Sequence, residues 1–163
     1  MFKKTYQSVA LVGLGGARKT QIALNTAYWV KENKLEYSIF WVPALSFTSF
    51  KQAYTDIAKE LSIPPNTQGE DIKISVKQFL SSKKAGYWLL IVDNADNIKI
   101  LYKSADNQKG LVNYLLQSDN SVTLFTTHSR EVALSVADDT MVQLDTISLP
   151  KAEALLRKSI IRK

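Results

Sequence analysis

The chain has 163 residues, of which 45% are hydrophobic and 22% charged, so it can fold as one globular domain with a sizeable core. It contains no cysteine and one histidine, which excludes a disulfide framework and a cysteine-based metal site and argues against zinc. No apolar stretch approaches the roughly 20 residues that span a bilayer, and too few residues precede the first expected strand for a signal peptide. We therefore expect a cytoplasmic protein that makes no membrane contact.

The net charge of +6 is concentrated at the two ends of the chain. Lys3 and Lys4 lie at one end, and at the other end a run of five basic residues accompanies the single acid Glu153. A solvated helix face explains this excess more simply than a nucleic-acid surface does. We therefore do not expect nucleic acid as a partner, and binding to it stays open as the less favoured alternative.

Strand-like and helix-like patterns alternate along the chain. An apolar strand from about residue 8 to residue 13 leads into a helix over Thr20–Lys31, which carries an apolar stripe. The short strand Ser38–Val42 follows. Apolar residues at steps of three and four then predict a helix over 47–61 that Ser46 can cap.

The later elements continue the alternation. Pro64 and Pro65 open a polar loop, after which a helix is expected from about Asp71 to Ser82. Then come the strand Tyr87–Val92, an irregular polar stretch and helical residues Leu111–Leu116. The strand Ser121–Thr127, a short helix containing Val132, Ala133 and Val136, the strand Met141–Leu144 and a last helix opened by Pro150 complete the chain.

The fold class follows from this alternation. Tyr87–Val92 is an unbroken apolar run, as expected of a central parallel strand that is covered on both faces. Five strands alternating with helices predict a three-layer α/β fold, with a five-stranded, mostly parallel sheet and helices on both faces. No internal repeat is visible, so we expect a single domain over residues 1–163.

The loop after the first strand matches the phosphate-binding pattern G-x-x-x-x-G-K-[ST] except at one position. Gly13, Lys19 and Thr20 fit, but Arg18 stands in place of the second glycine. A helix that starts near Lys19 would point its first N–H groups and its dipole at an anion. Lys19 would contact the β- and γ-phosphates, and the Thr20 hydroxyl would ligate Mg²⁺. The candidate nucleotide-binding residues here are Gly13, Gly15, Gly16, Ala17, Arg18, Lys19, Thr20 and Gln21.

Arg18 is the residue at which this loop departs from the phosphate-binding motif. Gly13, Gly15 and Gly16 allow dihedral angles that are closed to other residues and let the main chain approach oxygen atoms closely. Arg18 adds a Cβ at a crowded place, and a forced backbone there costs on the order of 1–3 kcal/mol, so affinity for nucleotide should be reduced. A dinucleotide-binding fingerprint overlaps the same glycines, but no acidic residue ends the next strand to hold a ribose, and we reject it.

A second polar group follows the strand Tyr87–Val92. Ligands of parallel sheets bind at the carboxyl ends of the strands, so Asp93 is positioned to bind Mg²⁺ beside Thr20. Asp96 could polarise a water molecule or equally cap a following turn, whereas Asn94 cannot act as a base. Asp93 and Asp96 are thus the candidate catalytic residues and Thr20 and Asp93 the candidate metal ligands. Any hydrolysis should be slow.

The third polar strand end is the run Thr126-Thr127-His128-Ser129-Arg130. His128 could sense a γ-phosphate, although it is neutral or weakly charged at pH 7 and is a poorer anion partner than arginine. Arg130 lies two residues further along. It is equally open that these residues only cap the next helix.

Three segments, in this order and spacing, resemble the nucleotide-binding core of NB-ARC proteins, which belong to the STAND group of signal-transducing P-loop ATPases. They are G-L-G-G-x-x-K-T-Q-I-A-L, W-L-L-I-V-D-N-A-D and L-F-T-T-x-S-R-E-V-A. The run Asp-Asn-Ala-Asp resembles fungal members in particular. The resemblance extends from about Ser8 to about Leu156.

This resemblance implies a cycle in which bound ADP holds an off state and ATP permits oligomerisation. It assigns Lys19 and Thr20 to the phosphate loop and Asp93 to Mg²⁺, and His128 stands where the family usually has a γ-phosphate-sensing arginine. It also implies a nucleotide-binding subdomain alone, without the ARC subdomains, effector domain and repeats of the family. Whether the chain is a fragment, a truncated product or a decayed copy stays open.

The sequence therefore predicts a signalling switch subdomain that binds ADP or ATP with Mg²⁺ and is at most a slow ATPase. The alternative is a pseudo-NTPase, an interaction or scaffold domain that no longer binds nucleotide, which the departures at Arg18 and His128 favour. The expected partners are an adenine nucleotide and either further copies of the chain or other domains of an NB-ARC protein.

Overall fold

Five parallel strands form the single sheet of the computed structural model, which describes residues 7–15, 18–64, 71–102, 109–115, 118, 120–137, 140–144, 150, 153–154 and 156–158. The strands are β1 Gln7–Val12, β2 Tyr37–Pro43, β3 Tyr87–Asp93, β4 Ser121–Thr127 and β5 Met141–Gln143. Their order across the sheet is β2-β3-β4-β1-β5, and all four pairings are parallel. The predicted α/β class is confirmed, and β2 lies at an edge of the sheet.

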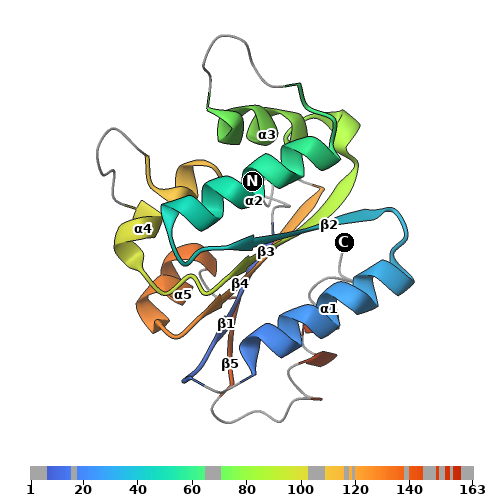
Figure 1. Ribbon diagram of the computed structural model, residues 1–163. Coiled ribbons are helices and arrows are strands. Elements are labelled where there is room, and N and C mark those ends of the chain that lie inside the picture. Colours follow the sequence, from blue (N-terminus) through green and yellow to red (C-terminus); the bar gives the residue numbers. More distant parts are fainter. Residues whose placement is uncertain are drawn as a thin grey trace, which may run out of the picture.

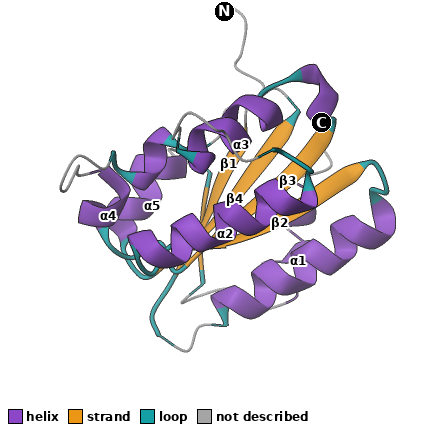
Figure 2. Ribbon diagram, turned by 45° about the horizontal axis from the view of Figure 1, so that its top comes forward, coloured by secondary structure: helices purple, strands orange, loops and turns teal. Residues whose placement is uncertain are grey.

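Helices cover both faces of the sheet, as predicted (Figure 1). They are α1 Lys19–Asn33, α2 Phe47–Glu60, α3 Ile72–Leu80, α4 Ile98–Tyr102 and α5 Arg130–Ala137, with short 3₁₀ turns η1 Lys83–Ala85 and η2 Leu111–Asn113. One apolar core lies under α2, α3 and α5, and a second lies under α1, on the opposite face. Figure 2 shows α1 and α2 running on either side of β2. No described helix is long and apolar enough to cross a membrane.

Side chains cap the first turns of α2 and α3 with hydrogen bonds. Ser46 caps α2 by accepting a hydrogen bond from the backbone N–H of Ser49 at 3.1 Å, and the Ser49 hydroxyl accepts one from the Ser46 N–H at 3.1 Å. This reciprocal pair satisfies two N–H groups that a helix start would otherwise leave unpaired. Asp71 caps α3 through a single hydrogen bond, which its side chain accepts from the Lys73 N–H at 3.1 Å.

Two local predictions are wrong. The stretch after β3 was expected to be irregular, but Asn97 accepts a hydrogen bond from the Lys99 N–H at 2.9 Å and starts the short helix α4. The helix expected over Leu111–Leu116 is only the 3₁₀ turn η2 within the residues described there. Gly110 precedes this turn, and a Cβ at that position would collide with the Leu101 carbonyl, so α4 and η2 pack through a glycine. The last helix is only partly described: Pro150, Glu153, Ala154 and residues 156–158 are helical.

Candidate nucleotide-binding site

The sheet order brings three polar strand ends together. Strands β3, β4 and β1 are neighbours, and parallel strands end at the same edge of a sheet. The Gly13 N–H, just past β1, donates to the Thr127 carbonyl at the end of β4 at 3.3 Å. The Asn94 N–H, just past β3, donates to the Thr126 hydroxyl at 2.9 Å. The start of α1 lies at this same edge, as the contact of Thr20 with Asp93 shows.

The strained position of the loop is Arg18. This residue precedes α1 with φ 54° and ψ 25°, in the left-handed region, and its side chain makes no capping hydrogen bond. Neither Gly13 nor Gly15 has a positive φ, so neither uses the left-handed conformation that glycine allows. A Cβ added at Gly15 would meet no protein atom within 4 Å. The left-handed turn therefore falls on the position where the motif has glycine and this chain has Arg18.

Lys19 folds back over the loop that precedes it. Its Nζ donates to the carbonyl oxygen atoms of Gly13 at 2.8 Å and Leu14 at 3.0 Å. The residue is only 6% exposed, although it is charged and is the first residue of α1. Buried ammonium groups require such partners, and these two bonds hold the charge at the inner side of the loop.

Thr20 and Asp93, which are 73 residues apart in sequence, meet as predicted. The Thr20 hydroxyl donates to Asp93 Oδ1 at 3.1 Å. The same oxygen accepts a short hydrogen bond from the Thr126 hydroxyl, and Asp93 is 6% exposed. Asn94, which has φ 58°, lies 3.4 Å from Asp93 Oδ2 through its side-chain nitrogen. A buried carboxylate and a hydroxyl thus share one point at the head of α1.

Asp96 binds the end of β4. Its Oδ1 accepts hydrogen bonds from the Thr127 hydroxyl at 3.0 Å and the His128 N–H at 2.6 Å. Its Oδ2 lies 2.7 Å from His128 Nδ1. Asp96 therefore does not cap a turn of its own segment. Both of its oxygen atoms orient His128, which is the residue expected to sense a γ-phosphate.

The residues beyond His128 cap and start the next helix, which was one of the two interpretations of this run. Ser129 Oγ accepts a hydrogen bond from the Val132 N–H at 3.2 Å and so caps α5. Arg130 is the first residue of α5 and is exposed. Gln21 is exposed on α1. The two remaining predicted loop residues, Gly16 and Ala17, lie outside the described part of the chain.

Thr126 is the functional residue that the sequence reasoning missed. It is fully buried at the end of β4, where its hydroxyl donates to Asp93 and accepts from the Asn94 N–H. The signal available in the sequence was a hydroxyl residue at the carboxyl end of a strand expected in a covered sheet, because buried polar groups need partners.

The oxygen ligands present suit Mg²⁺. Magnesium prefers hard oxygen ligands and is often bound by one or two carboxylates together with nucleotide phosphates. Thr20 Oγ1 and Asp93 Oδ1 supply such atoms next to the loop. No group of three or more His, Cys, Asp or Glu side chains gathers among the described residues, so a metal cage made by the protein alone is not seen there.

Comparisons with known proteins agree with this geometry. No protein-family model matches the chain. The nucleotide-binding leucine-rich repeat (NLR)-like protein of Hyaloscypha variabilis (strain UAMH 11265 / GT02V1 / F) is 34% identical over 169 residues, which cover 99% of this chain and 17% of that protein.

Two solved structures share the fold. Cdc6p of Pyrobaculum aerophilum matches 94% of this chain and 43% of its own with 16% identity and a TM-score of 0.57. The ORC1 protein of Aeropyrum pernix, solved in complex with DNA, matches 96% of this chain and 44% of its own with 14% identity and a TM-score of 0.60.

The strand order and the loop between β1 and α1 agree with the predicted three-layer P-loop fold, which both solved structures share. The alignment with the NLR-like protein runs through all three motif segments. This similarity to an NLR-like protein over 99% of the chain agrees with the resemblance to NB-ARC-type nucleotide-binding domains that the sequence motifs indicated. It spans only 17% of the length of this relative, so the activity of a whole NLR-like protein does not transfer to it directly.

Proposed function

We propose that the chain binds ADP or ATP with Mg²⁺ at the loop between β1 and α1 and acts as the nucleotide-dependent part of a signalling switch, with slow or no hydrolysis. The observation that carries the proposal is the 3.1 Å contact between the Thr20 hydroxyl and Asp93 Oδ1 at the head of α1. A hydroxyl and a buried carboxylate that meet across 73 residues beside a helix N-terminus are suited to a phosphate-bound metal ion.

Each candidate residue has a role in this proposal. The backbone N–H groups of the loop and of the first turn of α1 would hold the phosphates, and Lys19 would add a positive charge to them. Thr20 and Asp93 would hold Mg²⁺, which neutralises phosphate charge when it is bound. His128, oriented by Asp96, would contact the terminal phosphate.

Slow turnover follows from the same contacts. Asn94 is an amide and cannot accept a proton from water near neutral pH. Asp96 is the remaining candidate base, but its two oxygen atoms are already engaged by Thr127 and His128. Activation of water by Asp96 would require these contacts to break. The expected outcome is a domain whose state is set by which nucleotide is bound.

The alternative is a scaffold domain that no longer binds nucleotide. Two observations favour it. Arg18 occupies a left-handed conformation that glycine would take more readily, and Lys19 is bound to carbonyl groups of its own loop. Nucleotide binding would have to compensate for the loss of either Lys19 bond that the phosphates displace.

Thermal unfolding with ADP and Mg²⁺ separates the two functions. A ligand at 100 times its dissociation constant stabilises the native state by about 2.7 kcal/mol, which should raise Tm by roughly 5–10 °C for a domain of this size. Thr20→Val should keep the fold and lose the part of the shift that depends on Mg²⁺. A Tm that does not change with ADP, in the presence or absence of Mg²⁺, would support the scaffold function.

The partners of the domain follow from its class and are part of the proposal. We expect a cytoplasmic protein in which the domain works with other domains of an NLR-like polypeptide or with further copies of itself. The DNA in the structure of Aeropyrum pernix ORC1 belongs to that protein. Electrophoretic mobility shifts with duplex and single-stranded oligonucleotides at two salt concentrations test whether this basic chain binds nucleic acid as well.

A further inference from the structure

Two cavities lie along the edge strand β2, and no described residue that lines them is a candidate nucleotide-binding residue. The first has a volume of about 460 Å³ and lies between β2 and α2. The second has a volume of about 390 Å³ and lies between β2 and α1. Ile39 and Glu60 line both cavities, so the two form one depression, which we call the β2-edge groove.

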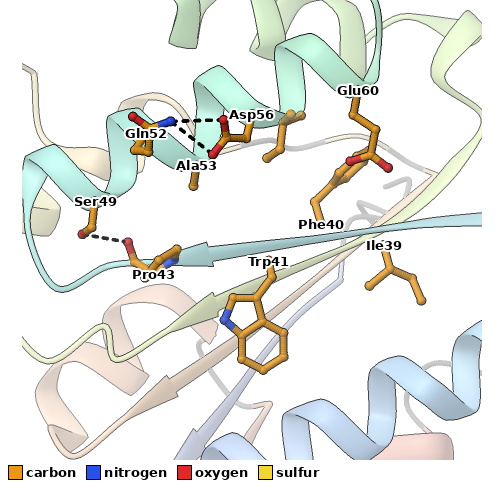
Figure 3. A pocket seen from close by; sticks show the side chains of 10 residues that line it. Ile39, Phe40, Trp41, Pro43, Ser49, Gln52, Ala53, Asp56 and Glu60 are labelled. Atoms are coloured by element: carbon orange, nitrogen blue, oxygen red, sulfur yellow. Dashed lines mark hydrogen bonds between the residues drawn. The ribbon is translucent and has the colours of Figure 1, made fainter.

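The groove has helical walls and a strand as its floor (Figure 3). Side chains of α2 reach toward β2 from one side, with Glu60 above Phe40, whereas Ile39 and Trp41 point to the other side, toward α1. Residues of α2 form one wall, residues of α1 form the other, and β2 lies between them. The residues that line it are Ser49, Gln52, Ala53, Asp56, Ile57 and Glu60 of α2, Leu24, Ala27, Tyr28 and Lys31 of α1, and Tyr37, Ile39, Phe40, Trp41 and Pro43 of β2.

The floor of the groove is an open strand edge. β2 pairs only with β3, and between Ser38 and Val42 no described residue forms a backbone hydrogen bond with its outer edge. An edge strand presents N–H and C=O groups that can pair with another strand. Its centre is the apolar run Ile39-Phe40-Trp41-Val42, which contains no lysine or proline, and Pro43 ends the strand. At about 3.3 Å per residue, the seven residues of β2 offer an edge of roughly 23 Å.

The charged side chains of the β2-edge groove indicate what kind of segment it can bind. Asp56 and Glu60 line the groove from α2, and Lys31 lines its other side from α1, in a chain whose net charge is +6. Lys59 lies 3.3 Å from Asp56, whereas Glu60 forms no ion pair within the described residues. The exposed Glu60 carboxylate lies above Phe40, the middle residue of β2. A segment that pairs with β2 would therefore meet a negative charge near its centre.

A second copy of this chain fits the groove poorly. Twofold antiparallel pairing of β2 with itself about Phe40 would bring two Glu60 carboxylates close together, and like charges at such a position are destabilising. We propose that the β2-edge groove binds an extended segment of a partner protein, which adds to β2 as a further strand and carries a lysine or arginine opposite Glu60. Main-chain hydrogen bonds supply the affinity, and alternate apolar side chains enter the space between the strand and the helices.

Fluorescence anisotropy with a labelled synthetic peptide of about nine residues tests this proposal. The peptide alternates valine with threonine and has lysine at its centre. We expect saturable binding to the wild-type chain and no binding of the same peptide with alternate backbone amides methylated, because methylation removes the hydrogen-bond donors. Glu60→Lys should weaken binding roughly three- to tenfold, as expected for reversing one charge of an exposed pair. A peptide with glutamate at its centre should prefer the Glu60→Lys chain.

Glu131→Lys is the matched control, because Glu131 is an exposed acid on α5, outside the groove. It should bind the lysine peptide as the wild type does. Equal binding of the methylated peptide, no dependence on Glu60, or no saturable binding by about 1 mM peptide would overturn the proposal. Sedimentation that shows a concentration-dependent dimer of the wild type, strengthened by Glu60→Gln, would overturn it in favour of pairing between copies.

Discussion

Arg18 holds a backbone conformation that glycine adopts at much lower cost. A left-handed backbone costs an L-residue about 1–2 kcal/mol. Glycine avoids this cost, but it loses more conformational entropy on folding, which costs about 0.5–1 kcal/mol. Arg18→Gly should therefore raise the free energy of unfolding by up to about 1 kcal/mol, as measured by urea denaturation. Arg18→Ala, which keeps the Cβ, is the control. An equal gain from alanine would show that the arginine side chain, and not its backbone, is the source of strain.

A second residue-scale prediction compares two threonines of β4. Thr126 and Thr123 are both fully buried, but Thr126 bonds to Asp93 and Asn94, whereas the Thr123 hydroxyl has no hydrogen-bond partner among the described residues. Thr126→Val should lower the free energy of unfolding by about 1–3 kcal/mol, because it leaves buried groups unpaired. Thr123→Val should be neutral or stabilising by about 1 kcal/mol, because it removes an unpaired hydroxyl. Similar losses in both variants would contradict this account of the site.

The residue scale also shows what the sequence could predict about the site. Thr20 and Asp93 could be paired in advance because both follow strands whose carboxyl ends share an edge. The contact between Asp96 and His128 could not, since it depends on the path of the segment after Asn94, which has a left-handed backbone. Likewise, sequence spacing identified Arg18 as a departure from the motif, but it could not show that Arg18 itself has a left-handed backbone.

At the scale of an element, α3 is anchored by a buried ion pair. Lys73 Nζ lies 2.9 Å from Asp71 Oδ2 and 4.5 Å from the ring centre of Tyr114, and the Lys73 side chain is 6% exposed. Burial opposes the ionisation of Asp71, but hydrogen bonds from Lys73 and the charge of Lys73 outweigh it and hold the pKa of Asp71 below its ordinary value of 3.8. The charged pair therefore links α3 to the turn η2.

This pair predicts a pH dependence of stability. Because the folded-state pKa of Asp71 is lowered, its contribution is complete above pH 3.8 and is lost as the pH falls through the folded-state pKa. Asp71→Asn keeps a good helix cap but removes the charge, and should lower the free energy of unfolding by about 1–3 kcal/mol at pH 7. Urea midpoints of both chains between about pH 3 and pH 7 should converge at the acidic end. A difference that stays constant across this range would refute the role of the charge.

Some helices could be predicted from their sequence and others could not. Helix α2 has apolar residues at regular helical spacing and a serine cap, so both its presence and its start were predicted correctly. Helix α4 has five residues, too few for a periodic pattern, and depends on the Asn97 cap and on close packing at Gly110. Periodicity therefore predicts long amphipathic helices and misses single turns that tertiary contacts stabilise.

At the scale of the whole molecule, the order of the strands determines where the candidate sites lie. The alternation of strands and helices predicted a parallel sheet, but it does not state that β4 lies between β3 and β1. That order brings Asp93, Thr126 and the loop to one place, and it leaves β2 at an edge between α1 and α2. One arrangement thus creates both the nucleotide site and the β2-edge groove, on separate parts of the domain.

The central claim is that the loop and Asp93 form a site for an adenine nucleotide. Titration of mant-ADP with Mg²⁺ into the wild type, Lys19→Met and Arg18→Gly measures it most directly. The wild type should give saturable binding, Lys19→Met should bind roughly tenfold more weakly or less through loss of a charged hydrogen bond, and Arg18→Gly should bind more tightly. No saturable signal in either the wild type or Arg18→Gly at high micromolar nucleotide would contradict the claim.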